Sequence, residues 1–200
     1  MRRVVNCFLP VIFAGLPVAS IAQDWSGGYS GLGLSASRGT ETEAIDGAQD
    51  IQEDIKGSQT ALFAGYSLHK GKIVYGGEVA YNHGRVVISE QSPDLNYIDR
   101  LFDLKARVGY SFGKVLVFGS AGWARADTYY AGVDGADEPL HASGLSYGLG
   151  ANYAVDENWF IGGEVLQRKL NLGEGDIPGF EEWSTQWKFT TVQLRVGVRF

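Results

Sequence analysis

The amino-acid sequence predicts an all-β fold, an eight-stranded antiparallel up-and-down transmembrane β-barrel. Three observations predict it: strand-like runs alternate between apolar and polar residues, the connections are short and long in turn, and aromatic residues gather at the ends of the runs. The length of 200 residues suits one domain. A content of 28 Gly, 10 Tyr, 10 Phe and 5 Trp residues fits crowded strands better than a helical bundle.

The clearest strand is the last stretch, residues 189–200. Apolar residues occupy every second position there, with polar, charged or glycine residues between them, which is the period of two of a β-strand. The stretch ends on an aromatic residue, Phe200. Its apolar face consists of Val192, Leu194, Val196, Val198 and Phe200.

Eight such runs follow one another, each about as long as a tilted strand that crosses a bilayer, ~9–11 residues. They are residues 29–38, 58–68, 73–83, 101–112, 115–127, 143–154, 159–168 and 188–200.

The connections between these runs alternate in length. Three are short turns, at residues 69–72, 113–114 and 155–158. The other four are 15 residues or longer, at 39–57, 84–100, 128–142 and 169–187. This asymmetry is typical of outer-membrane barrels, so it predicts termini and short turns on the periplasmic side and long loops outside the cell.

The two faces of most runs are distinct, but two positions in the pattern stay open. Residues 115–118 are apolar on both faces, so the phase of that strand is not fixed. Phe63 and Phe160 fall on the inner face, where they either fill the lumen or mark a shift of phase.

Aromatic residues lie near both ends of the runs, as expected of rings at the two boundaries between water and lipid. Those near the short turns are Tyr66, Tyr75, Tyr110, Phe112, Tyr153, Trp159 and Phe200. Those near the long loops are Tyr81, Phe102, Trp183 and Trp187.

The first 22 residues read as a cleaved signal peptide, which leaves residues 23–200 as the barrel domain. Arg2 and Arg3 precede a mostly apolar stretch, and the small residues Ser20 and Ala22 predict cleavage before Gln23. The only cysteine, Cys7, lies in this segment, so the mature chain is expected to hold no disulfide. Cleavage changes the formal charge from −6 to −8, and an acidic chain without a basic cluster argues against nucleic acid as a partner.

Two short motifs extend the pattern to a resemblance. The sequence DWSGGYSG at residues 24–31 and RVGVRF at 195–200 resemble the ends of small eight-stranded outer-membrane β-barrels, the family that includes the OmpA-type transmembrane domain and porin-like surface proteins of α-proteobacteria. The resemblance implies a porin-like or structural barrel of a Gram-negative outer membrane. It also implies that Phe200 is the signal for insertion by the barrel-assembly machinery, and that outer-membrane lipids and lipopolysaccharide surround a monomer.

Charged residues on the predicted inner face form the candidate site. Counting from the short turns places Glu78, Arg107, Glu164 and Arg195 at similar depth, with Glu78 near Arg107 and Glu164 near Arg195. Asp103 and Lys105 are expected to lie closer to the long loops. Unpaired charge in a narrow lumen is costly, so paired carboxylates and guanidinium groups are the expected arrangement.

An enzyme is not expected, and neither is a cofactor or a metal. His141 and Ser143 resemble the catalytic pair of outer-membrane lipid A deacylases, but Gly144 replaces the Asn that follows the serine in that family, and no partnering carboxylate can be placed from the sequence. The first long connection is acidic, which indicates a solvated loop or a divalent-cation site, although the spacing is not that of an EF-hand. Its acidic residues are Glu41, Glu43, Asp46, Asp50, Glu53 and Asp54.

Three functions are consistent with the pattern. The favoured one is a structural barrel with a polar lumen that is filled by side chains, because eight strands leave just enough room for them. The first alternative is a narrow pore for ions or small solutes. The second is a soluble lipocalin-like barrel, which would place its apolar face inside.

The signal-peptide interpretation predicts the mature N-terminus. Mass spectrometry of the protein purified from a Gram-negative membrane should give a chain that begins at Gln23, because the residues before it carry the processing signal. An intact Met1 would contradict the prediction.

Overall fold

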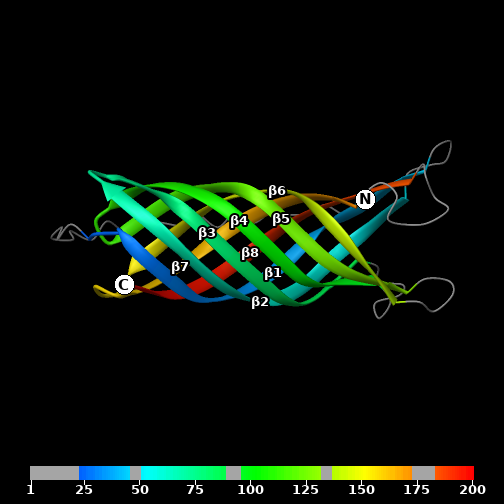
Figure 1. The fold of residues 1–200 in the computed structure, drawn as a ribbon, viewed down its shortest axis with the longest axis horizontal. Coiled ribbons are helices and arrows are strands. Elements are labelled where there is room, and N and C mark those ends of the chain that lie inside the picture. Colours follow the sequence, from blue (N-terminus) through cyan, green and yellow to red (C-terminus); the bar gives the residue numbers. More distant parts are fainter. Residues whose placement is uncertain (1–22, 46–50, 89–95, 132–136, 173–182) are drawn as a thin grey trace, which may run out of the picture.

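The computed structural model describes residues 23–45, 51–88, 96–131, 137–172 and 183–200. Eight antiparallel strands form one closed barrel in chain order, and the first strand pairs with the last (Figure 1). The strands are β1 Gly27–Ile45, β2 Ile51–Lys70, β3 Ile73–Val87, β4 Asn96–Phe112, β5 Val115–Ala131, β6 Asp137–Ala154, β7 Trp159–Leu172 and β8 Trp183–Arg199. The part of the chain described here contains no helix long and apolar enough to span a membrane.

The predicted all-β barrel is therefore confirmed, but its strands are longer than the sequence pattern indicated. β2 has 20 residues and β7 has 14. The predicted loop at residues 39–57 is mostly a continuation of the ladder between β1 and β2, where Gly39 lies opposite Ile55 and Glu43 opposite Ile51. The hydrophobic alternation ends where lipid contact ends, whereas backbone pairing continues because every N–H and C=O group needs a partner.

The short turns close tightly at one end of the barrel, where the C-terminus also lies (Figure 1). Gly71 and Gly113 have φ angles of 67° and 70°, which non-glycine residues rarely adopt, and these residues allow the turns between β2 and β3 and between β4 and β5. In the third turn the Asp156 carboxylate accepts hydrogen bonds from the backbone N–H groups of Asn158 and Trp159 at 2.8 and 2.7 Å.

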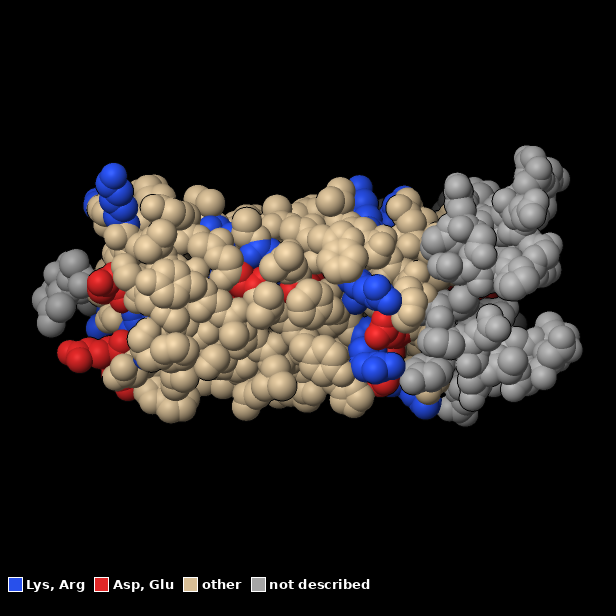
Figure 2. Space-filling model, viewed as in Figure 1, with Lys and Arg blue, Asp and Glu red and all other residues tan. Residues whose placement is uncertain are grey.

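Large apolar side chains cover the outside. Leu149 on β6 is 71% exposed, and Leu194 on β8 is exposed on the same outer face of the barrel. On the face that Figure 2 shows, most of the surface between the two ends is tan, with a few charged atoms near the middle, and the larger groups of Lys, Arg, Asp and Glu lie toward the ends. An outward apolar face is the opposite of what the soluble lipocalin-like alternative requires.

The open positions of the sequence pattern are resolved by burial. Phe63 and Phe160 point into the lumen and are almost completely buried. On β5, Leu116 and Phe118 point inward, whereas Val117 points outward.

One predicted boundary aromatic is wrong. Trp187 does not face lipid, because its side chain is only 3% exposed and its indole N–H donates to the Glu41 carboxylate at 2.7 Å. The same strand keeps its period of two from Trp187 to Arg199 on the inner face, so the ring fills the lumen near the long connections. The side chain of Trp183 lies outside the described residues.

The apolar outer face makes a prediction about stability. Val108 and Leu149 flank Gly119 in the register of β4, β5 and β6. Leu149→Arg and Val108→Arg should each destabilise the barrel by about 2–4 kcal/mol if this row lies near the bilayer midplane. Urea titration of the refolded protein in lipid vesicles measures the loss.

The matched control is Leu149→Met, which keeps the face apolar and should change the unfolding free energy little. Substitutions of the inward Gly148 are unsuitable as mild controls, because a Cβ atom there would lie 2.4 Å from the Val165 carbonyl oxygen. Equal stability of Leu149→Arg and Leu149→Met would show that this row does not contact lipid.

Candidate functional site

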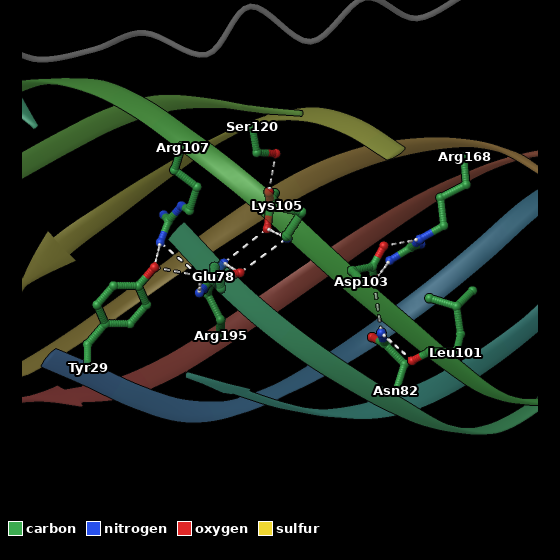
Figure 3. A network of polar contacts seen from close by, with 11 residues as sticks. Tyr29, Glu78, Asn82, Leu101, Asp103, Lys105, Arg107, Ser120, Arg168 and Arg195 are labelled. Atoms are coloured by element: carbon green, nitrogen blue, oxygen red, sulfur yellow. Dashed lines mark hydrogen bonds and ion pairs between the residues drawn. The ribbon is translucent and has the colours of Figure 1, made fainter. Parts of the chain in front are cut away.

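The lumen is filled by layers of side chains whose order can be read along a single strand. On β3 the large inward residues are Val74, Glu78, Asn82 and Val86, all buried, and the small Ala80 is buried between Glu78 and Asn82. Val74 belongs to an apolar cluster near the short turns, and Val86 belongs to another near the long connections. Glu78 and Asn82 belong to two polar layers between these clusters (Figure 3).

The first polar layer is built around Glu78. Its carboxylate receives Arg107 Nη1 at 2.8 Å, Lys105 Nζ at 3.1 Å and Arg195 Nη2 at 2.5 Å. The Tyr29 hydroxyl donates to Glu78 Oε2 at 3.1 Å and accepts from Arg107 Nη1 at 2.7 Å. One carboxylate thus contacts three cations that come from two other strands.

Glu164 on β7 completes this layer. Lys105 Nζ lies 2.9 Å and Arg195 Nη1 3.0 Å from Glu164 Oε2, and the Ser120 hydroxyl donates to Oε1 at 2.7 Å. Lys105 and Arg195 each contact both carboxylates, so Glu78 and Glu164 are joined through shared cations. We call the set Glu78, Lys105, Arg107, Glu164 and Arg195 the lumen charge cluster.

The lumen charge cluster contains three cations and two carboxylates, and it is secluded from solvent. Each of the five residues is at most 7% exposed. Aromatic rings support the excess positive charge, since the Arg107 guanidinium lies 3.7 Å from the centre of the Phe118 ring and that of Arg195 lies 3.9 Å from Phe63. Cation–π contacts of this kind gain strength when the cation is desolvated.

A second polar layer lies on the side of the long connections. Arg168 Nε and Nη2 donate to the two oxygens of Asp103 at 2.9 and 2.8 Å, a bidentate pair that satisfies the carboxylate geometry. Asn82 donates to Asp103 at 3.1 Å, and Arg168 Nη1 donates to the Thr191 hydroxyl at 2.7 Å. The layer is therefore neutral and hydrogen-bonded on several sides.

The sequence argument places some of these residues correctly and others not. Glu78 contacts Arg107 and Glu164 contacts Arg195, as the count from the short turns predicts. Lys105 was expected nearer the long loops, but it lies directly opposite Glu78 in the register and belongs to the first layer. A count from strand ends does not include the stagger between neighbouring strands, which sets the depth of each residue.

Three partners were missed by sequence reasoning. Arg168 ended its predicted run, although it follows Glu164 by four residues on the same face, and that spacing was a usable signal. Tyr29 and Ser120 carry no formal charge, so a search for charges passed over them.

The apolar cluster near the short turns packs aromatic rings on glycines. Each ring lies beside the glycine directly opposite it on a neighbouring strand, where a Cβ atom would come within 2.4 Å of the ring. These pairs are Tyr29 with Gly65, Phe63 with Gly31, Phe118 with Gly150 and Phe160 with Gly197. Trp25 adds a further ring, in edge contact with Phe160.

The apolar cluster near the long connections seals the other end of the described lumen. Its members are 0–4% exposed and come from seven strands or their ends. They are Ile55, Val86, Ile88, Ile98, Leu101, Ala124, Ala126, Ala142, Leu170, Trp187 and Phe189.

The outward His141 and Ser143 do not form a serine–histidine pair. The structure does supply a carboxylate that the sequence could not place, because His141 Nδ1 lies 2.9 Å from Asp127 Oδ1. Arg125 and Arg100 also approach Asp127, at 3.5 and 3.8 Å. Among the described residues, no hydrogen bond joins the Ser143 hydroxyl to the imidazole.

The remaining expected features are partly outside the description. Asp46 and Asp50 of the acidic connection are not described, nor is the side chain of Glu43. Within the described ranges, no group of three His, Cys, Asp or Glu side chains is arranged to hold a metal ion. Phe200 is 78% exposed, and its backbone exchanges two hydrogen bonds of 2.9 Å with Gly28, which closes the seam between β8 and β1.

Comparison with known proteins matches residues 7–200 to the family described as outer membrane protein beta-barrel domain. Among solved structures, Ail of Yersinia pestis, in complex with the heparin analogue sucrose octasulfate, is 17% identical, with a TM-score of 0.50 over 87% of this chain and 99% of Ail. Neisserial surface protein A is 14% identical, with a TM-score of 0.51 over 88% of this chain and 98% of its own. Identities this low show the shared fold alone. No curated protein sequence matches the chain.

The sharing of Glu78 among three cations predicts an order of stability. Glu78→Ala leaves three cations with one carboxylate and should cost about 3–5 kcal/mol. Arg107→Ala leaves two cations with two carboxylates and should cost less, about 1–3 kcal/mol, for the lost hydrogen bonds. Urea titration in vesicles measures both.

The double variant Glu78→Ala with Arg107→Ala separates the coupling from the single losses. Its cost should be smaller than the sum of the two, because the second change removes a cation that the first has orphaned. A greater loss for Arg107→Ala than for Glu78→Ala would contradict the shared arrangement.

Proposed function

Because the chain belongs to the outer membrane protein β-barrel domain family, we propose that it is a structural outer-membrane barrel whose lumen is closed by its own side chains. The observation that carries the proposal is the layering of the lumen. Two apolar clusters flank two polar layers, and the charged residues between them are almost completely buried. A continuous water path would have to cross all of these layers, and the side chains of the apolar clusters, other than Tyr29 and the two tryptophans Trp25 and Trp187, offer no polar group to replace hydration.

The proposal includes an orientation and a processing step. The short turns and both termini would face the periplasm and the long connections the exterior, as the loop asymmetry of such barrels predicts. Residues 1–22 would be removed as a signal peptide. Phe200 would act as the insertion signal for the barrel-assembly machinery, which is supported by its exposed ring at the edge of an outward apolar face.

The closed ladder supports a monomer. All eight strands have two neighbours, so no unpaired sheet edge invites a second copy. The outer surface would contact outer-membrane lipids and lipopolysaccharide. Long connections on the outer side would present the acidic segment to the surroundings.

A narrow pore is the second candidate, and one observation favours it. Arg107 Nε and Nη2 and Arg195 Nε are buried without a hydrogen-bond partner among the described residues. With one cation in excess, the lumen charge cluster has donors that could take a carboxylate from a neighbour if the pairs exchange. If the ion pairs exchange in this way, the lumen charge cluster alone would control whether ions pass through the barrel.

Conductance separates the two candidates. The wild-type protein in planar lipid bilayers should pass no large steady current, and Arg195→Ala should leave the current unchanged, because the apolar clusters still close the lumen. Adding Phe63→Ala and Trp187→Ala to Arg195→Ala truncates three layers and should raise the current. Heat-modifiable gel mobility would verify that each variant is folded.

The pore candidate predicts a different outcome. A large steady current in the wild type, or one opened by Arg195→Ala alone, would overturn the structural proposal.

A further inference from the structure

Four basic side chains form a continuous group on the outside of the barrel. They are Arg38 on β1, Lys56 on β2, Lys169 on β7 and Lys188 on β8, all exposed. We call this group the basic arc, since β7, β8, β1 and β2 are consecutive around the barrel. It stands out in a chain whose formal net charge is −6.

The register brings the members of the basic arc together. Lys169 lies directly opposite Lys188, and Arg38 lies directly opposite Lys56. Arg38 faces Thr190, two residues from Lys188, so these two basic residues are diagonal neighbours. Like charges directly opposite each other on adjacent strands are destabilising, and here two such pairs are joined.

The described part of the protein does not neutralise the basic arc. No described carboxylate lies within ion-pair distance of any of its four members. Asp54 shares the outward face two residues from Lys56 and forms no ion pair with a described residue. Among the described residues, one nearby carboxylate on the outward face thus stands against four positive charges.

On the other half of the barrel, β3 to β6, basic residues near the long connections are paired with carboxylates of the chain. There Asp99 and Asp127 lie 3.8 Å from Arg100, Asp127 lies 3.5 Å from Arg125, and His83 and His141 contact the same two carboxylates. β3 to β6 therefore carry their own counter-charges. Within the described ranges, the absence of such pairs on the basic arc is therefore a local difference and not a general property of this surface.

The basic arc lies just beyond the lipid-facing band. Arg38 follows Leu34, Lys169 follows Val165 and Lys188 precedes Val192 by four residues each. Four strand residues rise about 13 Å along the strand, or about 10 Å along the axis of a tilted barrel. This distance carries the charged groups from the apolar band into the layer of lipid headgroups.

We propose that the basic arc binds phosphate groups of glycolipids in the outer leaflet. The inference rests on the proposed function, which places the long connections and this end of the barrel at the outer leaflet. Ammonium and guanidinium groups suit phosphate oxygens, with Arg38 as a planar donor and the lysines as mobile point charges. The aliphatic stems can lie along the lipid-facing surface while the charges reach the headgroups.

Phosphate binding also removes the electrostatic conflict within the basic arc. A phosphomonoester between Lys169 and Lys188 would convert a repulsive cross-strand pair into two attractive contacts. On β3 to β6 the basic residues described above already have carboxylate partners, so phosphate groups should prefer the side of the barrel formed by β7, β8, β1 and β2.

The test uses the folded mature protein in maltoside micelles with three additions: lipid A bearing two phosphates, dephosphorylated lipid A, and inorganic phosphate. The thermal unfolding midpoint of the wild type should rise with bisphosphorylated lipid A and not with the other two, because ligand binding to the folded state stabilises it. Lys169→Gln with Lys188→Gln should require at least about tenfold more bisphosphorylated lipid A for the same rise.

Two variants control for net charge and for site geometry. Arg100→Gln with Arg125→Gln removes the same charge from the neutralised half and should keep the wild-type response. Lys169→Arg with Lys188→Arg keeps the charge of the basic arc, so this variant should also show the wild-type response to lipid A. If the Lys169/Lys188 glutamine pair does not fold, Arg38→Gln with Lys56→Gln makes the same comparison on the other half of the arc.

Each outcome decides the inference. An unchanged lipid A dependence in both glutamine variants of the basic arc, or an equal loss in the Arg100/Arg125 control, would overturn it. An equal rise with dephosphorylated lipid A or with inorganic phosphate would overturn recognition of a lipid phosphate. Recovery of the wild type outside the outer membrane would instead overturn the proposed function, whatever the micelle titration gives.

Discussion

The closure of eight strands into one barrel is the constraint on which the rest of this structure depends. Closure pairs every strand on both sides, which an apolar membrane demands of any β structure that crosses it. The same closure fixes a lumen about as wide as the side chains that point into it. Inward residues must therefore fit one another across the barrel, and their chemistry is set by the space and by their burial.

The lumen meets this constraint with layers of different polarity. Glu78 and Glu164 share Lys105 and Arg195, so the two carboxylates are linked across the barrel through common cations. Removing one member leaves several partners unsatisfied, which makes such a cluster selective for one arrangement of strands. The apolar clusters on both sides lower the local dielectric constant around the lumen charge cluster. The low dielectric constant strengthens the attraction within each ion pair, and it also raises the free-energy cost of leaving a charge without a partner.

The period of two was sufficient to predict the fold and the inward position of Glu78, Arg107, Glu164 and Arg195. It was insufficient for Lys105, because depth depends on the stagger between strands, and one strand's sequence does not contain that stagger. Strand ends such as that of β1 were missed because ladder pairing continues beyond the lipid-facing alternation. The inward aromatics have a readable signal in hindsight: Phe63 and Phe160 each face a glycine on the neighbouring strand, but that pairing is visible only once the register is known.

The inside and the outside of the barrel treat charge according to what can neutralise it. The charged side chains of the lumen are almost completely buried, and their counter-charges Glu78, Glu164 and Asp103 come from the chain itself. At the boundary between lipid and water, anions are present in the headgroups, and a protein carboxylate is not required. The two opposed basic pairs of the arc can therefore persist on the outer surface, whereas the same pairs in the lumen would separate the strands that hold them. Among the described residues the basic arc has no carboxylate partner, and in the proposed arrangement the phosphates of the surrounding glycolipids take that role.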